Sequence, residues 1–143
     1  MRRGLAATLC ALAAIAAPAA LAATAHDYRG IVDGGGRVHL RVKRAGGVRR
    51  LVRFDFRRVD LTCNGHHHTA TGNLDFAPRI RHGSFAFRAR NGRGGTIRVA
   101  GELKHHGRRA TGRIRLRGTL RVNGDGIAHH CDSHRRHWTA RRR

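Results

Sequence analysis

The stretch that most constrains the fold is the run from Val48 to Cys63, VRRLVRFDFRRVDLTC. Apolar and polar residues alternate along it, with Val52, Phe54 and Phe56 on one face, and the alternation changes phase before Val59. Period-two alternation is typical of a β-strand that buries one face, and a change of phase is typical of a β-bulge, here near Arg57-Arg58. The run therefore predicts one long, bulged strand that ends on a cysteine.

Shorter alternating runs recur along the rest of the chain, and glycine-rich turns separate them. Asn-Gly occurs three times, which favours tight hairpins because both residues tolerate positive φ. No window after the first 25 residues shows the 3.6-residue period of an amphipathic helix. The sequence therefore predicts an all-β fold, a single antiparallel β-sandwich or flattened barrel of about eight or nine strands.

Residues 1–25 differ from the rest and predict a secretory signal peptide. A short basic segment precedes an apolar run over 5–17, which is short for a membrane span, and small residues follow. Cleavage is expected after Ala22 or Ala25, and an uncleaved N-terminal anchor is the alternative. We therefore expect a secreted, extracellular protein with one β domain over 26–143 and no transmembrane segment after cleavage.

Two cysteines remain in the expected mature chain, Cys63 and Cys131. An exported chain with two cysteines most simply forms one disulfide. Closing a loop of about 70 residues would remove chain entropy from the unfolded state and stabilise the fold by at most roughly 4 kcal/mol. Two thiolate ligands of a metal ion are the competing interpretation.

The charge of the chain is extreme, with 30 basic and 8 acidic residues and a net charge of +22. Lys43 and Lys104 are the only lysines, so almost every base is arginine. Such a charge favours adhesion to an anionic polymer, for example a cell-wall polymer, extracellular nucleic acid or an acidic polysaccharide. The codon bias of a high-GC genome is the alternative explanation, although it accounts for arginine over lysine and not for the scarcity of acids.

Alternation places arginines on the outward side of several predicted strands, and it puts Arg49 and Arg53 on the same outward face of the long central strand. The outward positions form a solvated face unless they continue as a stripe across neighbouring strands, which would make a binding surface. All five Phe are expected in the core, and so is Trp138, which leaves little to stack on nucleobases. Binding is therefore expected to be electrostatic and blind to nucleic-acid sequence. The candidate polyanion-binding residues are Arg37, Arg41, Arg49, Arg53, Arg113, Arg115 and Arg117.

Histidine is the second excess, with twelve in the chain. If the two cysteines approach each other, the histidines near them could gather, and imidazole is a good ligand for Zn²⁺ or Cu²⁺. No Cys-x2-Cys knuckle is present, however, and adjacent histidines in a strand point to opposite faces. Metal binding or scavenging is therefore the second hypothesis, and a purely structural role in the envelope is the third. The candidate ligands are His66, His67, His68, His129, His130, His134 and His137.

No arrangement of residues predicts catalysis. Asp132-Ser133-His134 contains the residue types of a catalytic triad, but consecutive strand residues diverge and no nucleophile elbow surrounds the serine. Glu102 is the only glutamate, and nothing in the sequence pairs it with a second carboxylate for glycoside hydrolysis. We therefore expect no enzymatic activity and no cofactor.

Short motifs in a fixed order resemble those of uncharacterised small exported, single-domain β-sandwich proteins of high-GC Gram-positive bacteria. The landmarks span the whole expected mature chain: Tyr28-x-Gly30, Phe54 and Phe56, Cys63-x-Gly65, Gly83-x-Phe85, Gly101-x-Leu103, Ala110-x-Gly112, Cys131 and Trp138-x-Ala140. The resemblance implies that the two cysteines pair and that the C-terminal Trp-x-Ala strand completes the sheet. One departure is the group's Cys-x-x-Gly, which reads Cys131-Asp132-Ser133-His134 here, so a different turn is expected after Cys131.

Overall fold

The computed structural model describes residues 22–143, so the apolar run of the predicted signal peptide lies outside the described part. The described residues contain ten strands and no helix, which confirms the predicted all-β, antiparallel fold. The strands are β1 (Thr24–Val32), β2 (Arg37–Ala45), β3 (Val48–Cys63), β4 (His66–Leu74), β5 (Arg79–Ile80), β6 (Ser84–Arg90), β7 (Thr96–Lys104), β8 (Arg109–Arg121), β9 (Ala128–Asp132) and β10 (Arg136–Arg142).

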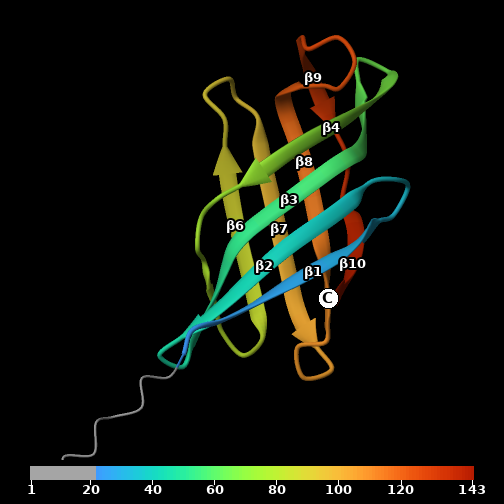
Figure 1. Cartoon of the computed structure of the whole chain (residues 1–143). Coiled ribbons are helices and arrows are strands. Elements are labelled where there is room, and N and C mark those ends of the chain that lie inside the picture. Colours follow the sequence, from blue (N-terminus) through green and yellow to red (C-terminus); the bar gives the residue numbers. More distant parts are fainter. Residues whose placement is uncertain (1–21) are drawn as a thin grey trace, which may run out of the picture.

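All ten strands belong to one sheet, in the order β10-β1-β2-β3-β9-β8-β7-β6, with β4 and β5 paired to β3. β10 also pairs with the first half of β8, while β9 pairs with the second half. The layer of β1 to β4 crosses the layer of β6 to β8 obliquely, and the core lies between them (Figure 1). The count exceeds the expected eight or nine because β5 has two residues and a short bend divides β9 from β10.

β3 occupies the centre of the fold, as the sequence predicts, and pairs with β2, β4, β5 and β9. The bulge expected near Arg57-Arg58 is confirmed, because the register with β4 shifts between Phe56 and Val59. Arg58 adopts a φ of 53°, and its amide donates a hydrogen bond to the Thr71 hydroxyl at 3.2 Å. The bulge therefore keeps both halves of β3 facing the core.

A disulfide between Cys63 and Cys131 joins β3 to β9, which confirms the predicted pairing. The two residues also face each other in the strand register. Their separation of 68 residues means that the bond ties the middle of the chain to its end. The thiolate-ligand alternative is wrong, because each sulfur is bonded to the other.

The core is organised around Trp138, which is 1% exposed. Its ring packs at 5.8 Å from the ring of Phe54 and 6.3 Å from that of Phe85, so it bridges the two layers. Gly101 and Gly112 lie against the indole, and a Cβ at either would come within 2.7 Å of the Trp138 Cζ2 atom. The expected core position of Trp138 thus depends on the absence of side chains at these glycines.

In the bend after β9, His134 stands at the position where the Cys-x-x-Gly motif described above has glycine, and its φ is 55°. This left-handed conformation favours glycine. Here it is stabilised by a hydrogen bond that the backbone amide of His134 donates to the Asp132 carboxylate at 2.8 Å. The chain therefore makes the turn without glycine.

β1 begins at Thr24, so cleavage after Ala22 would leave the strand whole, whereas cleavage after Ala25 would remove its first two residues. Within residues 22–143 there is no helix with the length and apolar character needed to cross a membrane.

Candidate polyanion-binding face

The outer face of β6, β7 and β8 carries a regular grid of side chains. Cross-strand partners in an antiparallel sheet point to the same side, and neighbouring strands lie about 4.8 Å apart. Arg88 is paired with Arg98, and Arg98 is paired with Arg115. These three residues, which we call the arginine row, therefore run straight across three strands.

The next positions along the strands extend the arginine row. Arg90, Thr96 and Arg117 face one another in that order across the same three strands. Three consecutive strands thus present five arginines on adjoining positions of one face, with a single threonine between them. The continuous stripe that the sequence left undecided is present on this side of the molecule.

The arginine row has few carboxylates to neutralise it. Among residues 22–143, Arg88 and Arg98 form no ion pair with a carboxylate. The positive charge of Arg90, followed by desolvation and the charge of Arg98, lowers the pKa of the Arg88 guanidinium. The positive charges of Arg88 and Arg98 are therefore held together without a carboxylate partner among the described residues.

Asp132 of β9 forms the boundary of this surface. Arg115 donates two hydrogen bonds to its carboxylate, at 3.2 and 2.7 Å, and Arg117 lies 3.9 Å from it. The hydrogen bond from Arg115 is the main reason that the pKa of Asp132 falls below its ordinary value. Asp132 therefore orients one end of the row and leaves Arg88 and Arg98 free to face solvent.

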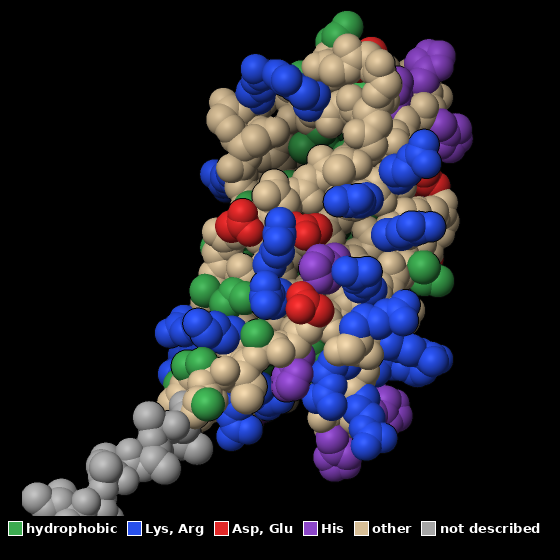
Figure 2. Space-filling model, in the orientation of Figure 1, with side chains coloured by type: hydrophobic (Ala, Val, Ile, Leu, Met, Phe, Trp, Pro, Cys, Tyr) green, Lys and Arg blue, Asp and Glu red, His purple; other side chains and the backbone are tan. Residues whose placement is uncertain are grey.

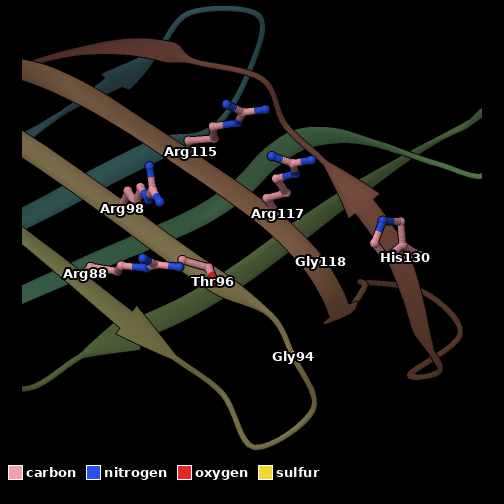
Figure 3. A pocket seen from close by; sticks show the side chains of 8 residues that line it. All are labelled: Arg88, Gly94, Thr96, Arg98, Arg115, Arg117, Gly118 and His130. Carbon is pink, nitrogen blue, oxygen red and sulfur yellow. The ribbon is translucent and has the colours of Figure 1, made fainter.

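A cavity of about 300 Å³ lies beside the row, lined among others by Arg88, Arg98, Arg117, Thr96 and His130. Figure 3 shows the side chains of these residues on the same side of the ribbon, contributed by β6, β7, β8 and β9. A guanidinium presents a planar fork of donors that matches a carboxylate, sulfate or phosphate group. This arrangement can hold anionic groups without any covalent chemistry.

The outer face of β1, β2 and β3 is different, although it contains three of the predicted residues. Arg41 pairs with Arg53 across β2 and β3, and Arg37 with Arg57. Acidic groups accompany them: the Arg53 guanidinium lies 3.0 Å from Asp55, and Arg41 lies 4.0 Å from Asp27. Figure 2 shows this mixture of acidic and basic side chains on the face in view.

His39 lies at the centre of that mixed face. Its Nε2 atom is 2.9 Å from the Asp27 carboxylate and its Nδ1 atom is 3.4 Å from that of Asp55. Arg41, Arg53 and His39 on this face therefore have acidic partners, whereas no ion pair joins Arg29, Arg37 or Arg57 to a carboxylate among residues 22–143.

Arg49 does not share a face with Arg53, contrary to the sequence analysis. The register between β2 and β3 shifts after Arg41, so Arg53 is exposed while Leu51, two residues earlier, is buried. Leu51, and not Val52 as predicted, therefore faces the core beside Phe54. Arg49 instead lines a cavity of about 180 Å³ with Arg142 and Tyr28. Burial raises the pKa of the Tyr28 phenol, whose hydroxyl donates to the Gly107 carbonyl at 2.7 Å.

Sequence reasoning missed Arg88, Arg90 and Arg98. Their outward direction could be inferred, because Phe85, Phe87, Ile97 and Val99 define the inward side of β6 and β7. Their alignment with Arg115 could not, because it depends on the register between three strands. The three predicted arginines of β8, Arg113, Arg115 and Arg117, do lie on this face.

The histidines near the cysteines do not converge as the metal hypothesis requires. His68 and His129 stack at 5.1 Å, and His129 also pairs with Asp125 at 2.8 Å. Across residues 22–143, no group of three or more His, Cys, Asp or Glu side chains is arranged to hold a metal ion. The positions of the remaining candidates follow from the strands: His66 and His67 are exposed on β4, His130 on β9 and His137 on β10, and His134 is exposed in the bend.

Ser133 has a structural role in the described fold. It is fully buried, its hydroxyl accepts a hydrogen bond from the Leu116 amide at 2.9 Å, and it donates to the His134 carbonyl at 2.8 Å. The hydrogen bond with Leu116 ties the bend between β9 and β10 to β8, and the one with His134 lies within the bend.

No protein family, curated protein or solved structure matches this chain. The resemblance to small exported proteins of high-GC Gram-positive bacteria therefore stays a prediction.

Proposed function

We propose that this chain is a secreted, non-catalytic binding domain for anionic polymers of the cell envelope or the extracellular space. The observation that carries the proposal is the alignment of Arg88, Arg98 and Arg115 across three strands, with no carboxylate of the described residues paired to the first two. The disulfide supports an oxidising compartment, and so does the signal-like N-terminal sequence.

The mechanism is charge attraction followed by hydrogen bonding. A polyanion releases condensed counterions when arginines replace them, and the affinity then falls linearly with salt concentration on a double logarithmic plot. The guanidinium groups of Arg88 and Arg98 can each donate two hydrogen bonds to one anionic group, whereas that of Arg115 is already paired with Asp132. Five arginines on adjoining positions provide several such contacts at once, which raises affinity without requiring a deep pocket.

The test is a salt titration of binding with the oxidised chain that lacks residues 1–22, at pH 8, where histidines are mostly neutral. The wild type is compared with the double variant Arg88→Gln/Arg98→Gln and with a control of equal charge, Arg41→Gln/Arg53→Gln. We expect the salt slope to fall by about 1.4–1.8 in the first variant, since each of the two lost contacts contributes about 0.7–0.9. The control should retain nearly the whole slope.

Two results would contradict the proposal. Absence of binding at low salt would show that the charge is background. Equal loss in both double variants would show that net charge, and not this face, determines binding.

A further inference from the structure

The arginine row has a second hollow on its other side, and this one has a neutral floor. The cavity measures about 570 Å³ and is lined among others by Ala86, Ala100, Arg98, Arg113 and Arg135. Its volume lies within the range of small-ligand sites, about 300–1,000 Å³.

The hollow follows from the register. Ala86 is paired with Ala100, and Ala100 with Arg113, so two methyl groups occupy the positions next to Arg88 and Arg98 on β6 and β7. Both alanines are exposed. Short side chains beside long arginines leave a depression whose floor is apolar and whose rim carries guanidinium groups.

The residues that line the hollow restrict the chemical class of ligand that it can bind. The rim repels cations and attracts carboxylate, sulfate or phosphate groups, and no carboxylate lines the hollow. Phe87 also lines the hollow, but its ring packs against those of Phe54 and Phe76 on the inward side, so it is not presented for a nucleobase to stack on. A flat apolar floor with donors at its edge fits a ligand with an aliphatic ring that bears hydroxyl and anionic groups.

We propose that the face formed by Ala86, Ala100 and the arginine row recognises an acidic polysaccharide. A sugar ring of the polymer lies on the two methyl groups, and its carboxylate or sulfate group binds Arg88 and Arg98, next to the Arg115–Asp132 pair. This inference rests on the proposed function and adds the ligand class: the row supplies attraction to any polyanion, and the alanine floor supplies preference for polymers with sugar rings over those with only phosphates.

The experiment separates the two surfaces with one substitution in each. Ala100→Leu fills the floor and leaves every charge in place, while Arg98→Gln removes a charge from the row. Ala45→Leu, at an exposed position of β2, is the control for added apolar surface. Binding is measured by calorimetry at fixed salt with two probes of similar charge, a heparin octasaccharide and an inorganic polyphosphate, and thermal melts verify that each variant is folded.

We expect Ala100→Leu to weaken octasaccharide binding at least fivefold and to change polyphosphate binding less than twofold. Arg98→Gln should weaken both probes, and Ala45→Leu neither. If Ala100→Leu leaves octasaccharide binding unchanged, or weakens both probes alike, the polysaccharide assignment is overturned while the polyanion function stands. If Arg98→Gln weakens neither probe, the proposed function itself fails.

Discussion

The two outer faces of this sheet carry similar numbers of arginines but differ in where their acidic residues lie. On β1, β2 and β3, Arg41 and Arg53 lie beside Asp27 and Asp55, which also contact His39. On β6, β7 and β8, Arg88 and Arg98 face each other without a carboxylate partner among the described residues. Unpaired arginines occur on both faces of the described residues, so the difference is one of placement: Asp27 and Asp55 flank the centre of the β1–β3 face, whereas Asp132 lies at one end of the arginine row.

The largest expected effect comes from disturbing the packing of Trp138, which lies between the two layers of the sheet. Gly112→Val would place a side chain where a Cβ already comes within 2.5 Å of the Trp138 ring and 2.0 Å of the Ala100 carbonyl. Overpacking of this kind destabilises a fold by about 1–3 kcal/mol. Chemical denaturation should show that loss in the free energy of unfolding. The control Thr111→Val changes the partly exposed residue next to Gly112 and should leave that free energy nearly unchanged.

A smaller effect makes the binding face resemble the other one. Thr96→Asp would put a carboxylate between Arg90 and Arg117, next to the row. An added charge pair at about 4 Å in water contributes about 1 kcal/mol, so we expect polyanion affinity to fall about fivefold to tenfold. Thr96→Asn, which has the same shape without the charge, should bind like the wild type; an equal loss there would mean that the threonine matters for its shape.

The converse substitution tests whether the acidic residues reduce the affinity of the β1–β3 face for polyanions. Asp55→Asn releases Arg53 and one contact of His39. Because exposed ion pairs contribute about 0.2–1 kcal/mol, polyanion affinity should rise about twofold. Asp75→Asn removes the same charge from the connection between β4 and β5, away from this cluster, and an equal rise in that variant would point to net charge alone.

The smallest expected effect concerns the pH dependence of stability. The pKa of Asp132 is lowered, chiefly by the hydrogen bond from Arg115, so its contribution is present above the unfolded pKa of about 3.9 and is lost as the pH falls through the lower folded value. Acid denaturation of Asp132→Asn should therefore be shallower than that of the wild type below about pH 4. Curves of identical shape would show that the pair with Arg115 does not contribute to stability.

The sequence predicted much of the fold because alternation is a local signal. The long strand that ends at Cys63, its bulge at Arg57-Arg58 and the inward Trp138 all follow from patterns within a few residues of one another. The disulfide followed from the cysteine count and the expected compartment.

The candidate site was only half predictable, because it depends on contacts between strands. Alternation within one strand predicted Arg113, Arg115 and Arg117. Arg88 and Arg98 belong to the candidate site only because the strand register aligns them with Arg115. Arg49 was misplaced for the related reason that a register shift between β2 and β3 is invisible in the sequence. The neutralising acids Asp27 and Asp55 also come from separate strands.

The most direct test of the central claim is a map of the bound surface by nuclear magnetic resonance. Backbone and arginine side-chain signals of the oxidised chain without residues 1–22 would be followed while a heparin octasaccharide is added at low salt. We expect the largest signal changes at Arg88, Arg98 and Arg115 and their neighbours on β6, β7 and β8, with small signal changes at Arg41 and Arg53. Changes spread evenly over both faces, or concentrated on β1 to β3, would contradict the central claim.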